Sequence, residues 1–385
     1  MDFSLTEEQS MFQRMVREFA EKEIKPICLE CDEQEKFPAE QVKRMGELGL
    51  MGVTIDEKYG GVGGDSIQQA IIVEELSRVS TAMGTIHIGC CSLGTYPVYT
   101  WGSEELKQKY VVPLAKGEKI GCFALTESGA GSDVVALETT ATKKGDYYIL
   151  NGVKTFISNG AEAEIITTFA TIDKSLKHRG ICAFMVESSL SGYSVGKKEK
   201  KLGIRATSTT ELILNNCQVP VENLIGGEGR GFYVALGTID SSRITVAAQG
   251  VGTAQGAFEA ALSFAKERKQ FGQPIANFQA IQWMLADMAT SIEAARLLTY
   301  QAAWLKDQSP EKEGILPWVK QAAMAKVFAS ETAMAVTTKA IQIHGGYGYV
   351  KEYPVERFFR DAKILEIYEG TSEMQRMTIA RSLLR

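Results

Sequence analysis

The stretch FALTESGAGSD, residues 123–133, marks the point where the pattern of the chain changes from helical to β-rich. Residues 123–126 suit a strand, and a loop rich in glycine and serine follows them. Backbone N–H groups and hydroxyls in such a loop can hold a phosphate or pyrophosphate, although an ordinary turn explains the same residues. The stretch therefore predicts the first strand of a β region and a candidate phosphate loop.

Short runs typical of strands continue from this stretch to about residue 221. They cover residues 122–126, 147–150, 164–171, 181–186 and 211–214, with turn residues between them. Asn151-Gly152 and Lys144-Gly145-Asp146 are typical of hairpin or strand connections. The pattern predicts a β domain, which we bound at residues 121–230.

Helical patterns occupy the chain on both sides of the β region. Thr6-Glu7-Glu8-Gln9 is a capping box, and the helical spacing after it ends at Pro26. Further helical patterns cover residues 39–48 and 67–79, and after Gly231 they cover residues 232–269, 278–306, 316–343 and 355–384. An apolar stripe in residues 281–298 suits helix-on-helix packing. We predict an α+β protein, mostly α, with an N-terminal helical domain over residues 1–120 and a helical bundle over residues 231–385.

The composition is that of an ordinary globular protein. Of 385 residues, 45% are hydrophobic and 23% are charged, which excludes a disordered or collagen-like chain. Lys and Arg total 42 against 47 Asp and Glu, a formal net charge of -5, so nucleic acid is not expected as a partner. No apolar run approaches the length of about 18 residues that suggests a membrane span, and the acidic start MDFSLTEE lacks the character of a signal peptide. We expect a cytoplasmic protein of bacterial type without a membrane partner.

The cysteines and histidines predict neither disulfides nor a metal site. The seven cysteines are odd in number and scattered along the sequence, which does not suit a set of disulfides and favours a reducing compartment. Cys28-x-x-Cys31 lacks the second pair of ligands that zinc needs, and His87, His178 and His344 are far apart in the sequence. No Gly-x-Gly-x-x-Gly or P-loop motif stands between a strand and a helix, so a nucleotide would be bound in another way.

Several motifs in one order resemble the acyl-CoA dehydrogenase flavoprotein family. They are residues 123–133, residues 342–361 with Arg357 and Asp361, IYEGTSEMQ at residues 367–375, RKQFG at residues 268–272 and FSLTEEQ at residues 3–9. The resemblance covers essentially the whole chain and is greatest to the short-chain or butyryl-CoA dehydrogenases. It implies an N-terminal helical domain, a middle β-barrel-like domain and a C-terminal four-helix bundle, which agrees with the pattern described above.

The resemblance implies FAD as the cofactor, bound between the β domain and the bundles of two subunits. The residues that match positions at the flavin ring or the pyrophosphate are Phe123, Leu125, Thr126, Ser132, Phe156, Ile157 and Ser158. Those that match contacts across the subunit interface are Arg268, Phe271, Gln279, Gln342, Gly345 and Gly346, so we expect an isolated chain to hold FAD poorly. Those that resemble the adenine side are Thr371, Glu373 and Gln375. Without the resemblance, Arg268 could be a surface charge and the Gly345-Gly346 pair a helix C-cap.

By the same resemblance, Glu369 stands in the catalytic place of the family. It would take the α proton of the acyl-CoA while flavin N5 takes the β hydride, and a dehydrated pocket would make its carboxylate a stronger base. The Glu369 backbone N–H and a ribityl hydroxyl would polarise the thioester carbonyl. The residues that match acyl-CoA contacts are Ser132, Asp240, Arg243 and Gly370. The competing interpretations are a solvated loop glutamate and an ion pair of Asp240 with Arg243 on one helix face.

Two positions narrow the substrate class that the resemblance implies. Ser242 stands where isovaleryl and long-chain members carry their base, and Gly84 stands where glutaryl-type members carry an arginine. A short acyl chain is therefore expected. The predicted pocket wall at residues 84–94 carries His87 and Cys90-Cys91, which are not the usual short-chain set, so a branched, cyclic or aromatic acyl group stays open. We expect His87 to be a hydrogen-bonded wall residue, and the alternatives are a second acid/base group or a polar contact to the substrate.

The resemblance therefore implies FAD-dependent α,β-dehydrogenation of a short-chain, branched or cyclic acyl-CoA to the trans-2-enoyl-CoA. The implied electron acceptor is an electron-transferring flavoprotein, and the implied assembly is a homotetramer built as a dimer of dimers. Three alternatives remain at this point. They are the enoyl-CoA reductase direction, as in an anaerobe, a non-catalytic DNA-associated relative, and an acyl-CoA oxidase, whose chains are usually longer.

Overall fold

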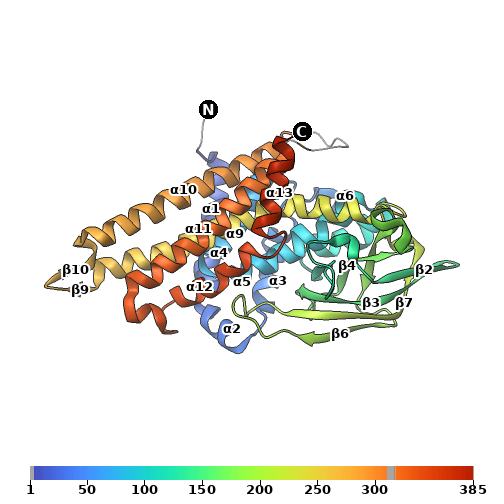
Figure 1. Ribbon diagram of the computed structural model, residues 1–385, viewed down its shortest axis with the longest axis horizontal. Helices are drawn as coiled ribbons and strands as arrows, with labels where there is room; N and C mark the ends of the chain where they lie inside the picture. Colours follow the sequence, from blue (N-terminus) through green and yellow to red (C-terminus); the bar gives the residue numbers. More distant parts are fainter. Residues whose placement is uncertain (1–3, 310–315, 317, 385) are drawn as a thin grey trace.

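The structure is a computed structural model that describes residues 4–309, 316 and 318–384. Phe3, the first residue of the FSLTEEQ motif, lies outside the described residues, as do residues 1, 2, 310–315, 317 and 385. Helices at both ends of the described chain enclose a sheet in the middle of the sequence (Figure 1). This order of elements is the predicted one.

The N-terminal region is helical up to the first strand. The capping box is formed as predicted, because Thr6 Oγ1 accepts from Gln9 N at 3.1 Å and Gln9 Oε1 accepts from Thr6 N at 3.1 Å. The elements are α1 (Glu7–Phe19), η1 (Ala20–Ile24), η2 (Lys25–Ile27), α2 (Cys28–Gln34), α3 (Ala39–Glu47), η3 (Leu50–Gly52), η4 (Glu57–Tyr59), α4 (Ser66–Val79), α5 (Thr81–His87), η5 (Ile88–Thr95), α6 (Tyr96–Trp101), α7 (Glu104–Leu106), η6 (Lys107–Val111) and α8 (Val112–Ala115). The helical path that starts at α1 thus passes through a short turn at Pro26, where the missing N–H of proline interrupts the ladder.

The middle region forms one eight-stranded sheet. Its strands are β1 (Gly121–Ala124), β2 (Thr140–Lys144), β3 (Tyr147–Ser158), β4 (Ile165–Thr171), β5 (Ile181–Glu187), β6 (Tyr193–Lys198), β7 (Thr209–Pro220) and β8 (Leu224–Ile225), and the order is β6-β7-β3-β2-β4-β5-β8 with β1 paired to β4. Short η7 (Val134–Ala136), η8 (Lys174–Gly180) and η9 (Val221–Asn223) connect them. Residues 144–146 turn the chain between β2 and β3 as predicted. The prediction of a connection at Asn151-Gly152 was wrong, because this pair lies inside β3 at a shift of register against β7.

Long helices form the C-terminal region. They are α9 (Gly231–Glu267), α10 (Gln279–Asp307) and α11 (Trp318–His344), and a small hairpin of β9 (Lys269–Gln270) and β10 (Gln273–Pro274) with η10 (Ile275–Asn277) joins α9 to α10. The helical stretch expected over residues 355–384 is interrupted. It consists of α12 (Val355–Ala362), η12 (Lys363–Glu366) and α13 (Ser372–Leu383), with η11 (Gly345–Tyr349) before them. The interruption at residues 367–371 contains Glu369.

The largest core joins the bundle to the N-terminal region. α9 packs against α11 and α4, and small apolar side chains of α9 and α11 allow the close approach. α4 is buried on nearly all sides, so it forms an inner layer beneath α1. The β9–β10 hairpin lies at the opposite end of the molecule from the sheet (Figure 1). Within the described residues, no helix combines the length and the apolar character needed to cross a membrane.

Candidate active site

The loop between η12 and α13 presents Glu369 in an unusual backbone conformation. Glu369 has φ 51° and Gly370 has φ 91°, so two successive residues lie in the left-handed region. A glutamate there is strained by about 1–3 kcal/mol and persists only where its surroundings hold it. Thr371 then caps α13, because its hydroxyl accepts from Met374 N at 3.3 Å. Such strain at a carboxylate is typical of a functional site.

Two buried side chains hold this loop through the carbonyl oxygen of Gly370. Gln375 Nε2 donates to it at 2.8 Å, and Lys326 Nζ from α11 donates to it at 2.7 Å. Gln375 Nε2 also lies 3.4 Å from the carbonyl oxygen of Glu369. Gly370 has φ 91°, which favours glycine, and a Cβ there would come within 2.8 Å of Gln375 Nε2 and displace it from its hydrogen bond.

The carboxylate of Glu369 has one buried oxygen and a raised pKa. Its Oε2 is buried without a hydrogen-bond partner in the part of the chain that the structure describes. Burial raises the pKa of Glu369 to about 7, against the opposing effects of the Ser242 hydroxyl, Lys326 and Arg243. A carboxylate with this pKa is partly ionised at neutral pH and is a stronger proton acceptor than an exposed one.

An ion pair on α9 lies next to this loop. Arg243 Nη1 donates to Asp240 Oδ1 at 2.6 Å, and burial raises the pKa of the Asp240 carboxyl. Arg243 is buried, and its Nε has no partner among the described residues. A Cβ at Gly370 would stand 3.9 Å from Arg243 Nη2. The predicted substrate residues Asp240, Arg243 and Gly370 therefore meet at Glu369, and the competing interpretation of an i,i+3 ion pair is correct at the same time.

The predicted phosphate loop follows β1 and rests on a buried ion pair. Lys154 Nζ, fully buried on β3, donates to Leu125 O at 3.2 Å and to Glu127 Oε1 at 2.7 Å. Glu127 also accepts from Thr139 N at 3.0 Å. The loop is tied to β3 a second time, because Thr155 N donates to Thr126 O at 2.9 Å. These contacts hold the backbone of the loop from beneath.

The outer face of this loop fits a large planar cofactor with phosphates. A Cβ at Gly129 or Gly131 would meet no atom within 4 Å, so the loop backbone is open. Phe156 is 66% exposed with φ 57°, and it lies at a shift of register between β3 and β7, so the irregularity of the strand turns this aromatic side chain outward. The other predicted residues here divide by exposure: Leu125 and Ile157 are buried, Phe123, Thr126 and Ser158 are half-buried, and Ser132 is exposed.

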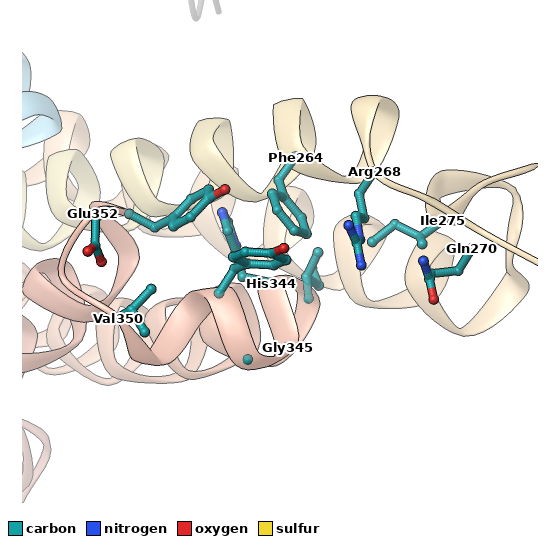
Figure 2. A pocket seen from close by; sticks show the side chains of 12 residues that line it. Phe264, Arg268, Gln270, Ile275, His344, Gly345, Val350 and Glu352 are labelled. Carbon is teal, nitrogen blue, oxygen red and sulfur yellow. The ribbon is translucent and has the colours of Figure 1, made fainter.

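A second group of predicted residues surrounds a pocket at the far end of the bundle. The pocket has a volume of about 680 Å³ and is lined by Arg268, Gly345 and Gly346 among others (Figure 2). The Arg268 guanidinium lies over the ring of Tyr347 at 5.2 Å and pairs with no carboxylate among the described residues. A Cβ at Gly345 or Gly346 would meet nothing within 4 Å. An unpaired arginine beside open backbone suits a pyrophosphate.

The structure does not bring all predicted FAD residues together within one chain. Arg268 and the β9–β10 hairpin with Phe271, which is 93% exposed, lie at the end of the molecule opposite to the sheet (Figure 1). Gln279 and Gln342 are exposed on α10 and α11, whereas Thr371 and Gln375 lie at the Glu369 loop with the exposed Glu373. The predicted FAD residues therefore form separate groups on one chain.

Three features at or beside the candidate site were not predicted from the sequence. They are Lys326, the pair of Lys154 with Glu127, and the hydrogen bond between Tyr368 and Gln249. A signal existed for Lys326, a single charge within the apolar run AAMAKVFA of α11. The Lys154–Glu127 pair and the Tyr368–Gln249 bond join segments that are far apart in the sequence, so no local pattern indicated them.

His87 and the cysteines belong to the protein core. His87 is fully buried, its Nε2 lies 2.9 Å from Leu50 O, and burial lowers its pKa to about 4. The structure therefore favours a hydrogen-bonded wall residue over a proton donor. Cys90 and Cys91 are buried in the N-terminal core, as expected for packing. The described residues contain no cluster of potential metal ligands.

Fold and site together define a three-part helix–sheet–helix protein with a strained glutamate of raised pKa and an open loop backbone after β1. Models of the N-terminal, middle and C-terminal domains of acyl-CoA dehydrogenase match residues 6–118, 122–217 and 229–384. The chain belongs to the acyl-CoA dehydrogenase family. The predicted family, fold, enzyme class and FAD cofactor are thereby confirmed.

Relatives of known activity match over the whole chain. "Acyl-CoA dehydrogenase, short-chain specific" from Clostridium acetobutylicum is 52% identical over 385 residues and covers 100% of both chains. The butyryl-CoA dehydrogenase structure from Megasphaera elsdenii is 45% identical with a TM-score of 0.96, and it covers 100% of both chains. A structure described as "Electron transferring flavoprotein of Acidaminococcus fermentans" is 50% identical with a TM-score of 0.97, again over 100% of both chains.

One relative bears on the direction of the reaction. A protein from Anaerotignum propionicum named "Acryloyl-CoA reductase (NADH)" is 45% identical over 390 residues, covering 100% of this chain and 96% of that protein. The dehydrogenase names nevertheless predominate among the relatives described here. The reductase direction and the DNA-associated alternative are therefore not favoured.

Proposed function

We propose that the chain oxidises a short-chain acyl-CoA to its trans-2-enoyl-CoA, with Glu369 as the group that removes the α proton. The observation that carries the proposal is the half-buried, strained Glu369, whose Oε2 is buried without a partner among the described residues and whose pKa is raised to about 7. A free carboxylate oxygen in a dehydrated site is ready to accept a proton from carbon.

The residues around Glu369 would have different roles in the removal of the α proton. Arg243 and Lys326 keep a fraction of the carboxylate ionised, since both cations oppose the effect of burial. The Glu369 N–H, for which no acceptor occurs among the described residues, is available to the thioester carbonyl and would acidify the α carbon. FAD, when bound, supplies the acceptor for the β hydride. Asp240, Gly370 and Ser132 would position the pantetheine part of coenzyme A.

The FAD site would be completed by a second subunit. The sheet of one subunit would hold the flavin and the phosphates through the open loop and the exposed Phe156. Arg268, Phe271 and the Gly345-Gly346 backbone of its partner would meet the pyrophosphate and the ribose. Apolar side chains on the outside of the bundle, among them Trp283 and Trp304 of α10, support a homotetramer.

A short acyl chain is supported by the polar side chains behind the Glu369 loop. Gln249 is fully buried, and its Nε2 donates to Thr81 O at 2.9 Å and to Thr85 Oγ1 at 2.8 Å. Its Oε1 accepts from the hydroxyl of Tyr368, the residue before Glu369. A long acyl chain would have to break these bonds, at about 1–3 kcal/mol for each buried group left unpaired.

The electron acceptor and the location are part of the same proposal. The structure described as an electron transferring flavoprotein of Acidaminococcus fermentans supports such a flavoprotein as the partner. All seven cysteines lie in the described region and are unpaired, which suits the cytoplasm.

Anaerobic titration of the FAD-loaded protein tests the function. Butyryl-CoA should bleach the flavin absorbance, octanoyl-CoA should do so more slowly, and Glu369→Gln should bind crotonyl-CoA without being reduced by butyryl-CoA. Glu222→Gln, at an exposed position on η9, is the control and should behave as the parent. Rapid bleaching of Glu369→Gln would remove Glu369 from its role, and an FAD-loaded parent that no acyl-CoA bleaches would refute the activity.

A further inference from the structure

Lys326 is a fully buried lysine in the middle of an apolar helix. It lies on α11 among Ala322, Ala323, Ala325 and Ala329, which are buried as well. Taking an ammonium out of water costs several kcal/mol unless partners compensate for the loss. Such a lysine therefore needs a specific reason.

The geometry shows where the Lys326 ammonium is used. Within the described residues its one hydrogen bond goes to the carbonyl oxygen of Gly370, at 2.7 Å. The same oxygen accepts from Gln375 Nε2 at 2.8 Å, so two buried donors converge on it. The peptide that they hold joins Gly370 to Thr371, one residue after Glu369, and both Glu369 and Gly370 have positive φ, 51° and 91°. Movement of this carbonyl would turn the carboxylate.

The charges around Lys326 tie it to the same loop. Glu369 is the largest favourable charge for its ammonium, Arg243 on α9 opposes it, and Glu366 on η12 and Glu331 on α11 add smaller attractions. Glu331 is itself paired with Arg376 at 2.7 Å. Burial lowers the pKa of Lys326 to about 8, so it carries its proton at pH 7.

We propose that Lys326 is a positioning residue for proton abstraction: it fixes the Gly370 carbonyl and thereby aims the Glu369 carboxylate at the substrate. The inference rests on the proposed role of Glu369 as the base. It assigns no contact with substrate or cofactor to Lys326, whose effect is transmitted through the loop backbone and through its charge. A second consequence is that the cation helps Glu369 to stay ionised.

Two substitutions separate the hydrogen bond from the charge. Lys326→Met removes both at similar length, whereas Lys326→Gln keeps an N–H donor for the Gly370 carbonyl without the charge. Lys339→Met is the matched control, because Lys339 lies on the same helix, is 38% exposed and pairs with Asp287 on the surface. FAD content and the melting temperature establish that each variant is folded.

The readouts are the rate of flavin reduction by butyryl-CoA between pH 6 and 8, and the dissociation constant for crotonyl-CoA. Lys326→Met should reduce the rate roughly 10- to 100-fold, as expected for a misplaced catalytic group, with crotonyl-CoA binding changed less than about threefold. Both Lys326 variants should shift the midpoint of the pH profile upward, because the cation that favours the ionised form of Glu369 is lost. Lys326→Gln should recover part of the rate.

Three results would overturn the inference. One is an unchanged rate and pH midpoint in a folded Lys326→Met. Another is an equal loss of rate and of crotonyl-CoA binding, which indicates a general collapse of the site. The third result concerns the case in which Lys326→Met does not fold. The inference is then overturned if Lys326→Gln folds and its pH profile has the same midpoint as that of the parent. The proposed function has its own test in Glu369→Gln, so the two can fail separately.

Discussion

The hydroxyl of Tyr368 donates a hydrogen bond to the side-chain carbonyl of Gln249, 119 residues earlier in the chain. The bond joins the loop that carries Glu369 to the middle of α9. Gln249 is held from its other side by Thr81 and Thr85 of α5. The buried amide of Gln249 thus supports the Glu369 loop, and both of its polar atoms are hydrogen-bonded.

Gln249→Ala should lengthen the acyl chain that the enzyme accepts. The shorter side chain opens space behind Glu369, so the ratio of kcat/KM for octanoyl-CoA to that for butyryl-CoA should rise roughly tenfold, a difference of about 1.4 kcal/mol. Gln249→Leu is the control, since it fills the space without the hydrogen bonds. An equal ratio in the parent and in Gln249→Ala would show that Gln249 does not limit the acyl group.

Glu369→Gln should make the protein more resistant to heat at pH 8 than the parent while abolishing its activity. The folded pKa of Glu369 is about 7 against an ordinary value of 4.5, so the buried group disfavours folding once it is ionised. Its contribution to stability is favourable below the ordinary pKa and is lost as the pH rises through 7. The gain in melting temperature should therefore be larger at pH 8 than at pH 5. A gain that is equal at both values would contradict the raised pKa.

Lys154→Met should destabilise the β domain strongly. The substitution leaves the buried carboxylate of Glu127 with only backbone N–H partners, and breaking a buried ion pair costs about 3–5 kcal/mol. Urea unfolding measures the loss. Lys174→Met is the control, because Lys174 faces Glu138 at 3.9 Å with both side chains exposed, and such pairs contribute about 0–1 kcal/mol. Equal losses in the two variants would show that the buried pair has no special role.

Local patterns were sufficient to predict the longest helices and five of the strands, whereas β2, β6, β8 and the helices α5 to α8 were not predicted. The Thr6–Gln9 capping box and the long apolar periodicities lie within single elements, so their physics is visible in a short window. The prediction of a connection at Asn151-Gly152 was wrong because the same dipeptide occurs in tight turns and in β-bulges. The pairing of β3 with β7 decides between the two, and it is not visible in a short window of sequence.

The site could be predicted only in part, and for a related reason. The helical stretch expected to end at residue 384 contains the break at residues 367–371, which depends on Lys326 and Gln375 holding the Gly370 carbonyl. The sequence shows Gly370, but it does not show that Lys326 and Gln375 donate to its carbonyl oxygen and so stabilise its positive φ. The motif around Glu369 was recognised by resemblance, whereas the long-range contacts that shape it required the structure.

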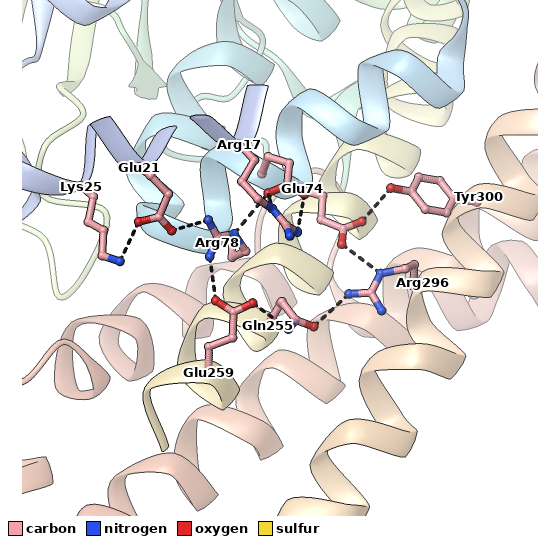
Figure 3. A network of polar contacts seen from close by, with 10 residues as sticks. Arg17, Glu21, Lys25, Glu74, Arg78, Gln255, Glu259, Arg296 and Tyr300 are labelled. Atoms are coloured by element: carbon pink, nitrogen blue, oxygen red, sulfur yellow. Dashed lines mark hydrogen bonds and ion pairs between the residues drawn. The ribbon is translucent and has the colours of Figure 1, made fainter. Parts of the chain in front are cut away.

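Arg78→Met should weaken the attachment of the N-terminal helices to the bundle. Arg78 is 8% exposed and pairs with Glu75 at 3.2 Å, with Glu259 at 2.7 Å and with Glu21 (Figure 3). Without the Arg78 guanidinium, the fully buried carboxylate of Glu75 keeps only its ion pair with Arg17. We therefore expect the free energy of unfolding to fall by about 3–5 kcal/mol. Lys22→Met, at an exposed i,i+4 pair with Glu18, is the control and should change stability by less than about 0.5 kcal/mol. A loss in Arg78→Met no larger than that of the control would show that the network does not stabilise the fold.

Arg268→Ala should weaken FAD binding without disturbing the fold of the subunit. The Arg268 guanidinium faces the pocket of about 680 Å³, and no carboxylate pairs with it in the described chain. Removing a charge-assisted bond to a pyrophosphate costs about 1.5–3 kcal/mol, which is roughly a 10- to 100-fold increase in the dissociation constant for FAD. Lys266→Ala, two residues earlier and exposed, is the control. Fluorescence titration of the stripped protein with FAD measures both constants, and a constant in Arg268→Ala equal to that of the parent would place the pyrophosphate elsewhere. If the site is shared between subunits, the weaker binding should appear together with an unchanged melting temperature of the FAD-free protein.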